Sequence, residues 1–313
     1  MEIREGTNKD IPGILKVLKA SLGETSSRKT ENVWRFKHVD NPFGESLVLL
    51  ALENEEVIGV RAFMRWQWQK GEEVFSAFRA VDTATHPDHQ GKGIFKKLTL
   101  KALEIGKERG DNFVFNTPNS QSKPGYLKMG WKEVDKLKVS LRPVNPFFWK
   151  GRNGKYTYPT KWNKSGSPDF LKALQEEKAA TGQLFTPKNL EYLCWRYVKN
   201  PLQDYHVEAT PDYFLAGYVK DQGKFRELRI SEALKSPGLP EKILRREVKN
   251  WAKKYGVQVI SCSPDSGLDF TCSITGKFGP VLTFRDMALA ENDKQKFLNL
   301  DSWAYSTGDL ELF

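Results

Sequence analysis

Apolar and polar positions follow clear periods through the first 90 residues, and these periods predict a succession of strands and helices. Apolar residues at helical spacing predict helices, and alternating or continuous β-branched and apolar runs predict strands. Turn residues such as Lys70-Gly71 separate the last three runs, which therefore form an antiparallel meander. The predicted elements are a strand at 2–4, a helix at 11–22 that begins after Asp10, a short helix around 34–36, and strands at 47–53, 57–68 and 74–85.

The pattern changes after residue 90. Ile94, Leu98, Ala102 and Ile105 recur at helical spacing and predict a helix from 93 to 109. Further elements are predicted down to residue 142, after which residues 143–168 show no period and favour a linker or crossover. These elements are a buried strand at 113–115, a short helix around Tyr126, and a strand at 131–141.

Short echoes of the first half recur in the second half in the same order. Repeated order at similar offsets indicates two structurally related halves. The echoed pairs are Trp34-Arg35 with Trp195-Arg196, Asn41-Pro42 with Asn200-Pro201, residues 117–120 with 263–266, and Gly130 with Gly276.

Composition limits the classes of protein that fit. Hydrophobic residues make up 39% of the 313 positions, which argues against disorder. The start of the chain lacks an apolar signal-peptide core, and no apolar run is long enough to span a bilayer. The three cysteines and four histidines do not have the spacing of metal ligands, so we expect no metal site. We expect the thiols to be free and the protein to be cytoplasmic. The net charge of +10 fits either an anionic ligand or a solubilising surface.

The stretch Ala84–Leu98, ATHPDHQGKGIFKKL, joins a strand to a helix through a bare basic turn. The first helical turn has unpaired backbone N–H groups, and the helix dipole adds positive charge there. Glycines let a ligand approach the backbone closely. The turn is therefore either a pyrophosphate cradle or a tight connection whose glycines satisfy geometry alone. We call residues 90–93 the cradle.

The cradle resembles the acetyl-CoA-binding motif of the GNAT N-acetyltransferases, (Q/R)-x-x-G-x-(G/A). Gln90 fills the first position and Gly93 the fourth. Phe95 stands at the sixth, where a bulky residue resembles the enhanced-intracellular-survival (Eis-like) branch with two GNAT-like halves.

A second motif strengthens the resemblance. GNAT proteins carry N-x-x-A-x-x-x-Y-x-x-x-G-(F/W), and Asn119, Ser122, Tyr126, Gly130 and Trp131 follow that spacing, with Ser in place of Ala. The resemblance implies an α/β (α+β) fold of two tandem GNAT-like domains, each a mixed, mostly antiparallel twisted sheet flanked by helices.

The expected division is a catalytic domain at 1–142 with the acetyl-CoA site, a linker at 143–166, and a degenerate domain at 167–313 that shapes the acceptor pocket. The implied acetyl-CoA contacts lie on one strand end, the cradle and two later positions: Thr83, Ala84, Thr85, Gln90, Gly91, Lys92, Gly93, Ile94, Phe95, Asn119 and Ser122.

The second half lacks the same equipment. Ser236-Pro-Gly-Leu-Pro240 stands where a cradle would be, and its two prolines remove N–H donors. Cys272 stands at the offset of Tyr126. We therefore expect one acetyl-CoA site.

The resemblance also assigns chemical roles. Backbone N–H groups around Ala84 and Thr85 would polarise the acetyl carbonyl, and Tyr126 would protonate the leaving thiolate. Three candidates remain for the base: Asp82, the terminal carboxylate of Phe313, and a chain of waters. Trp66 and Trp68 either line the acceptor pocket or belong to the core.

The expected function is transfer of acetyl from acetyl-CoA to a primary amine of a small molecule, with an amino sugar suggested by the resemblance. We expect neither a nucleic-acid nor a membrane partner, and the sequence gives no oligomeric state. Two alternatives remain: a Fem-type aminoacyl transferase using charged tRNA, which the intact cradle disfavours, and a non-enzymatic acyl-CoA-binding protein.

Overall fold

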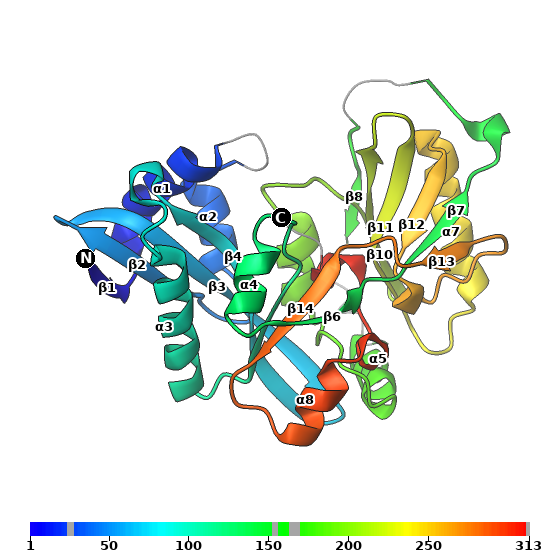
Figure 1. The fold of residues 1–313 in the computed structure, drawn as a ribbon. Helices are drawn as coiled ribbons and strands as arrows, with labels where there is room; N and C mark the ends of the chain where they lie inside the picture. The colour runs from blue at the N-terminus through cyan, green and yellow to red at the C-terminus, as the bar shows by residue number, and fades with distance from the viewer. Residues whose placement is uncertain (24–27, 152–155, 163–169, 311–313) are drawn as a thin grey trace.

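The computed structural model describes residues 1–23, 28–151, 156–162 and 170–310. Two seven-stranded sheets lie side by side, and helices flank both of them (Figure 1). Most strand pairs are antiparallel, with parallel pairs at β4–β5, β8–β9 and β11–β12. The predicted fold class, two mixed and mostly antiparallel sheets with flanking helices, is confirmed.

The first sheet is built mainly from the N-terminal part of the chain. Its order is β1 (Glu2–Glu5), β2 (Leu47–Glu53), β3 (Glu56–Lys70), β4 (Glu73–Thr85), β5 (Phe113–Asn116), β14 (Val281–Asp286) and β6 (Lys132–Lys136). The predicted strands and helices up to residue 130 all form, and those predicted with definite bounds end within about two residues of them.

Helices cover both faces of this sheet because each helix has one apolar stripe. Helix α1 (Ile11–Leu22) packs with α2 (Glu31–His38) on one face, where Ile14, Trp34 and Val60 share a buried cluster. Helix α3 (Ile94–Glu108) covers the other face through Leu98 and Ala102. The short helix α4 (Lys123–Lys128) packs on the same face as α3, where Tyr126 joins the cluster of Leu98 and Ala102.

The second sheet repeats this arrangement. Its order is β13 (Ile274–Gly276), β7 (Val139–Pro143), β12 (Val259–Cys262), β11 (Arg226–Lys235), β10 (Tyr213–Asp221), β9 (His206–Ala209) and β8 (Thr160–Trp162). Helix α7 (Glu241–Tyr255) covers one face. The other face meets α5 (Phe170–Ala180), α6 (Leu190–Leu193) and the π-helical turn η4 (Cys194–Val198).

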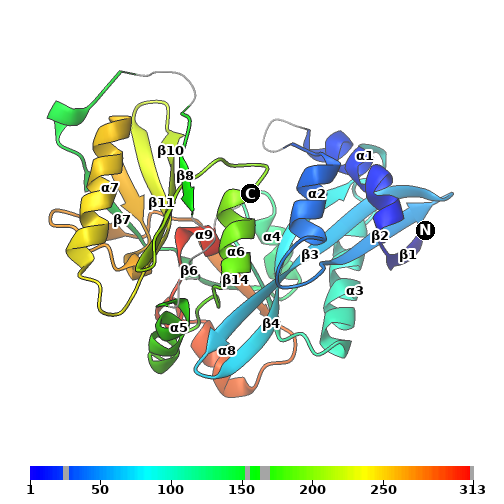
Figure 2. The same ribbon diagram turned by 180° about the vertical axis from the view of Figure 1, so that it is seen from behind.

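The two halves exchange one strand each. Strand β7, which follows β6 directly, pairs with β12 and β13 of the second sheet. Strand β14, from the C-terminal part, inserts between β5 and β6 of the first sheet (Figures 1 and 2). The prediction of one strand over 131–141 is therefore wrong, because the chain breaks at Leu137-Lys138 and continues in the other sheet.

The exchange also affects the predicted domain limits. The limit at residue 142 falls inside β7, so strand pairing crosses it. Part of the predicted linker forms structure, since residues 146–148 make a 3₁₀ turn and Thr160–Trp162 make β8. The rest of that linker includes residues 152–155 and 163–166, which lie outside the described residues.

A β-bulge occurs on the corresponding strand pair of both sheets. In the first sheet Arg61 pairs with Thr83 and Ala62 with Val81, so Asp82 is the extra residue. In the second sheet the pairing of β10 with β11 shifts between Ala216 and Gly217, so Ser231 is extra. Matching bulges on matching strands support the interpretation that the halves are structural repeats.

An aromatic core joins the two sheets. Trp66 and Trp68 of β3 are fully buried and contact Trp195, Trp303 and Phe115 edge to face. The indole Nε1 of Trp66 donates a hydrogen bond to the Thr186 hydroxyl at 3.1 Å. Of the two roles considered for Trp66 and Trp68, the structure places them in the core.

Candidate functional site

The candidate site lies where β4 and β5 separate. These parallel strands pair over Ala77–Arg79 and Phe113–Phe115. Beyond Arg79, β4 continues to Thr85 and pairs with β3 at every residue except Asp82, whereas β5 ends at Asn116. The bulge at Asp82, where φ is +40°, bends β4 at this point. The separation leaves a wedge between the two strands, with backbone groups of β4 along one side.

The cradle lies at the N-terminus of α3, beyond the end of β4. Gly91 and Gly93 have φ of +77° and +74°, values that L side chains rarely adopt. Open space surrounds the Cβ position of each, so a ligand can reach this backbone. Gly93 is the N-cap residue and supplies no side-chain cap. The amides of the first turn of α3 therefore point outward without an intrahelical acceptor.

Side chains around the cradle set its charge and shape. Gln90 and Lys92 are exposed, and the Gln90 amide donates to the Thr85 carbonyl at 3.4 Å. Lys92 lies 3.3 Å from Nδ1 of His89. Ile94 turns its side chain into the core under α3, which leaves its amide as the group that faces a ligand. Ala84 packs its methyl group on the α1 side. These placements fit an anionic ligand held by backbone amides and Lys92.

A buried guanidinium connects Tyr126 to β4. Arg61 of β3 is fully buried, and its Nη1 donates to the Tyr126 hydroxyl at 2.8 Å and to the Thr83 hydroxyl. Within the described residues, Nε and Nη2 of Arg61 have no hydrogen-bond partner. A charged group buried with two unsatisfied donors is costly in a folded protein, so it marks a site where a ligand group is expected.

Phe95 closes one side of this group. Its ring lies edge to face with Tyr126, with ring centroids 5.6 Å apart, and 5.7 Å from the Arg61 guanidinium carbon. A Cβ on Gly125 would lie 3.1 Å from the Phe95 ring, so Gly125 leaves room for it. The bulky residue at the sixth motif position therefore holds α4 and the Tyr126 hydroxyl against Arg61.

The structure gives Asn119 and Ser122 a capping role. The Asn119 carbonyl oxygen accepts from the Ser122 amide and hydroxyl, both at 2.9 Å, and from the Gln121 amide at 3.1 Å. These bonds fix the turn into α4 and so the position of Tyr126. Their predicted contact with acetyl-CoA stays a prediction.

Asp82 points to the opposite face of the sheet from Tyr126. Its carboxylate pairs with Lys37 and accepts from His38 Nε2 at 3.0 Å, both on α2. Burial by itself raises the pKa of Asp82, but Lys37 and His38 outweigh burial and hold that pKa well below its ordinary value. Burial in turn lowers the pKa of His38. A carboxylate with so low a pKa is a weak base, and a base role for Asp82 stays a prediction.

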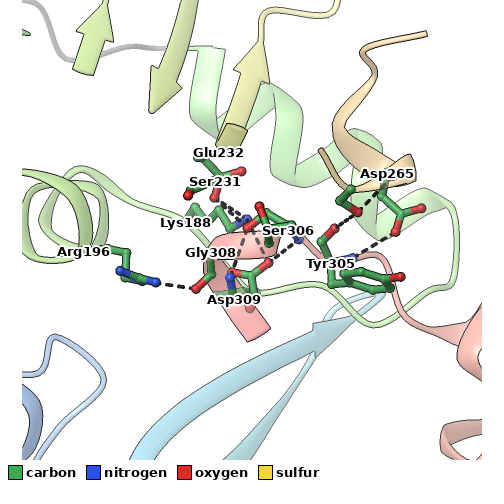
Figure 3. A network of polar contacts seen from close by, with 12 residues as sticks. Lys188, Arg196, Ser231, Glu232, Asp265, Tyr305, Ser306, Gly308 and Asp309 are labelled. Carbon is green, nitrogen blue, oxygen red and sulfur yellow. Dashed lines mark hydrogen bonds and ion pairs between the residues drawn. The ribbon is translucent and has the colours of Figure 1, made fainter. Parts of the chain in front are cut away.

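The C-terminal segment docks between the halves through buried charges (Figure 3). Lys188 Nζ contacts Glu232 at 2.7 Å and Asp309 at 3.0 Å, and all three residues are at least nine-tenths buried. Ser306 donates to Glu232 at 3.0 Å, and its amide donates to Asp309 at 2.8 Å. One lysine shared by two carboxylates fixes the segment that precedes residue 311.

The same segment reaches β4. Arg79, fully buried, donates to the carbonyl oxygens of Asp309 at 3.1 Å and Leu310 at 2.6 Å. Leu310 therefore lies beside the strand whose next residues form the bulge. Phe313, the other predicted base, lies outside the described residues.

In the second half this segment occupies the corresponding wedge. Thr307 donates to the carbonyl of Ile230 on β11 at 2.7 Å, and Ser263, just after β12, donates to the Tyr305 carbonyl at 2.6 Å. Helix α7 begins at Glu241, and its N-cap residue, Pro240, supplies no side-chain cap. The second wedge is thus filled by the protein's own chain.

Arg61 and Lys37 are among the residues of this site that were not predicted from the sequence. Arg61 stands in an apolar strand, and its alternation with Val60 and Ala62 is what an outward-facing residue also shows. Lys37 directly follows Phe36 on the short helix α2. A cation within an otherwise apolar run is the signal that could have found Arg61.

Among the described residues, no group of three or more histidine, cysteine or acidic residues could hold a metal ion. In the same ranges, no helix is both long and apolar enough to cross a membrane.

Comparisons with known proteins agree with this fold. Residues 2–134 match the sequence model of the family "Acetyltransferase (GNAT) domain". None of the proteins with curated functions matches the chain.

Solved structures share the architecture of nearly the whole chain. A probable N-acyltransferase from Enterococcus faecalis aligns with TM-score 0.63 and 11% identity over 91% of this chain and 72% of its own. Eis1 from Mycobacterium abscessus gives 0.57 and 13% over 95% and 75%. A putative acetyltransferase from Pyrococcus horikoshii gives 0.52 and 14% over 92% and 89%. The predicted resemblance to a tandem GNAT protein is confirmed.

Proposed function

We propose, from the premise that residues 2–134 form a GNAT acetyltransferase domain, that this protein transfers the acetyl group of acetyl-CoA directly to a primary amine of a small molecule. The observation that carries the proposal is the separation of β4 from β5, with the cradle at one end of the wedge and the Tyr126 hydroxyl beside it. The cradle would then bind the phosphates of acetyl-CoA while Tyr126 acts as the acid at its thioester end.

The cradle would hold the pyrophosphate of acetyl-CoA. Amides of the first turn of α3, the left-handed glycines and Lys92 supply the donors and positive charge. The pantetheine arm would run along the free edge of β4, over Thr83–Thr85. A backbone amide near the bulge would then polarise the acetyl carbonyl.

The chemical step exchanges one bond for another. The lone pair of the neutral amine attacks the acetyl carbon, the C–N bond forms and the C–S bond breaks. The Tyr126 hydroxyl gives its proton to the leaving thiolate. Arg61, 2.8 Å from that hydroxyl, stabilises the phenolate that remains. The proton lost by the amine passes to a base.

Water is the base that the geometry favours for this last step. The Asp82 carboxylate faces α2 and is held ionised by Lys37 and His38, away from the Tyr126 side of the sheet. Water molecules in the wedge can carry the proton to solvent. Asp82 and the terminal carboxylate of Phe313 are the other two candidates for the base. Substitution of Asp82, removal of Phe313 and the pH profile of kcat in each variant test them.

The second half contributes walls and support instead of a second cofactor site. Its wedge holds residues 305–310, which support β4 through Arg79. An amino sugar is the acceptor that the sequence suggested, and it belongs in the first acceptor screen. The filled wedge and the open cradle favour an acetyltransferase over a Fem-type aminoacyl transferase.

Calorimetric titration of the full chain with acetyl-CoA tests the proposal. We expect one site per chain. Two sites would contradict the closed second wedge, and no binding would overturn the acetyltransferase proposal. Binding without turnover of any amine would favour the non-enzymatic acyl-CoA-binding alternative.

A further inference from the structure

A cavity of about 790 Å³ lies on the second sheet, on the face opposite α7. Leu228 and Ile260 point to α7 and share its buried cluster. The residues that alternate with them, Arg229 and Val259 among others, line the cavity. Its volume falls in the range of small-molecule pockets, roughly 300–1,000 Å³.

One end of the cavity reaches the wedge in the first sheet. Thr117, which directly follows β5, lines the cavity, and so does Leu310, whose carbonyl Arg79 of β4 binds. Phe115 faces the core between the halves, while Val114 faces α3 on the side of Tyr126. Because side chains alternate along a strand, Thr117 points to the same face of the sheet as Phe115. The cavity therefore approaches the wedge from the side opposite Tyr126.

The lining is mainly apolar. Floor residues such as Leu141 and Tyr218 are joined at the rim by Phe225, Ile274 and Phe278, which are 41%, 67% and 57% exposed. Exposed large apolar side chains around a hollow indicate that a ligand covers them. The expected ligand therefore has a sizeable apolar body.

The charges on the lining are mostly positive. Lys138, Lys220 and Arg229 line the cavity with a single carboxylate, Glu227. Glu227 already accepts from Arg229 at 2.9 Å, from Gln222 at 2.5 Å and from Ser261. The contact with Glu227 also engages Arg229, and Lys138 Nζ pairs with Asp301 at 2.9 Å. Lys220 is therefore the cation of the lining that has no ion pair among the described residues. Its charge favours an anionic group on the ligand and disfavours a polycation.

We propose that this cavity binds the acetyl acceptor, and that the acceptor is an amine with an apolar ring or chain and an acidic group distant from the amine. The inference rests on the proposed acetyltransferase function. The amine would lie at the Thr117 end, where its nitrogen bonds to the acetyl carbon as the thiolate leaves. The acidic group would lie toward Lys220 on β10.

A matched set of amines tests this chemistry. We expect 4-(aminomethyl)benzoate to show a kcat/KM about tenfold above that of 4-methylbenzylamine, which lacks the carboxylate. Both should exceed glucosamine and spermidine. A higher kcat/KM for glucosamine or spermidine, or equal values across the set, would overturn the proposal.

Variants locate the site independently of turnover. Val259→Trp fills the floor and should weaken binding of 4-(aminomethyl)benzoate to the CoA-saturated protein about tenfold or more, with acetyl-CoA affinity unchanged. Val74→Trp, on an exposed residue outside the cavity, is the control. Lys220→Gln should remove most of the preference for the carboxylate, and Lys224→Gln in the same hairpin should not.

The outcomes separate the two proposals. Failure of the wild-type protein to bind acetyl-CoA would overturn the proposed function. Normal acetyl-CoA binding, with no calorimetric binding of 4-(aminomethyl)benzoate or with Val259→Trp and Lys220→Gln indistinguishable from wild type, would overturn this inference alone.

Discussion

The N-termini of α3 and α7 occupy equivalent places in the two halves but have different turn chemistry. Before α3, Gly91 and Gly93 adopt φ of +77° and +74° and leave the backbone open. Before α7, Pro240 has φ of −62° and lacks a backbone N–H. The topology is shared, so the difference teaches that a few turn residues decide which half can hold an anion.

The wedges of the two halves differ in the same way as these turns, since only the first is suited to a ligand. In the first half the wedge is bordered by Arg61, which has two donors without a partner in the described residues. In the second half, Ala216 of β10 stands at the position that corresponds to Arg61 of β3. Residues 305–310 fill the wedge there. One wedge is equipped for a ligand and the other for the protein's own chain.

Gly93→Asp is the strongest way to break this comparison. The left-handed backbone and a carboxylate facing phosphate both oppose binding, so acetyl-CoA affinity should fall about a thousandfold or more. Calorimetry measures it. Gly238→Asp in the turn before α7 is the matched control, since Gly238 has open space and no positive φ. Unchanged affinity in Gly93→Asp would show that the cradle lies elsewhere.

Asp82→Asn compares the two bulges. Loss of the carboxylate leaves Lys37 buried without its partner, so the free energy of unfolding should fall by roughly 3 kcal/mol. Ser231→Ala at the equivalent bulge should cost less than about 1.5 kcal/mol. Thermal and denaturant unfolding of both variants measure these losses.

The same variant has a pH signature. The pKa of Asp82 is lowered in the folded protein, so its stabilisation is present above the unfolded pKa of about 4 and is lost as pH falls toward the folded pKa. The Asn variant should therefore lose less stability than wild type over that acid range. An equal acid loss in both proteins would contradict this account.

Tyr126→Phe sharpens the comparison in the chemical step. Without the phenolic proton, kcat should fall about a hundredfold while acetyl-CoA affinity stays nearly unchanged. Cys272→Ala, at the corresponding offset in the second half, should leave both quantities unchanged. Full activity of the Tyr126 variant would remove it from the chemistry.

Arg61→Met separates function from stability. The phenolate would lose its cation, so kcat should fall about tenfold. The free energy of unfolding should not fall, because the change removes a buried charge that has no ion pair among the described residues. Arg61→Lys should recover part of kcat. A loss of stability with unchanged kcat would make Arg61 a structural residue.

Local elements could be predicted from the sequence with good accuracy. The helix at Ile11–Leu22 and the strand at Leu47–Glu53 have the predicted ends, because period and turn residues are local signals. The bare turn at residues 90–93 was predictable for the same reason, since its glycines stand at a strand–helix junction.

Non-local relations could not be predicted in this way. Residues 131–141 carry one alternating pattern, and nothing in that pattern tells that Val139–Pro143 pairs in a different sheet. Arg61 could not be told from a solvent-facing residue because its burial depends on α3 and α4, which cover it from elsewhere in the chain. Pairing partners and covering elements decide such cases.

The strand exchange has a consequence for the order of events during synthesis. The ribosome makes β5 and β6 early, but β14, which belongs between them, is made more than 140 residues after β6 is complete. Until then the first sheet has a gap beside β5, next to the strand end that forms the wedge. Acetyl transfer should therefore begin only after nearly all of the described chain has left the ribosome, and a product stopped after residue 276 should be inactive although it carries every cradle residue.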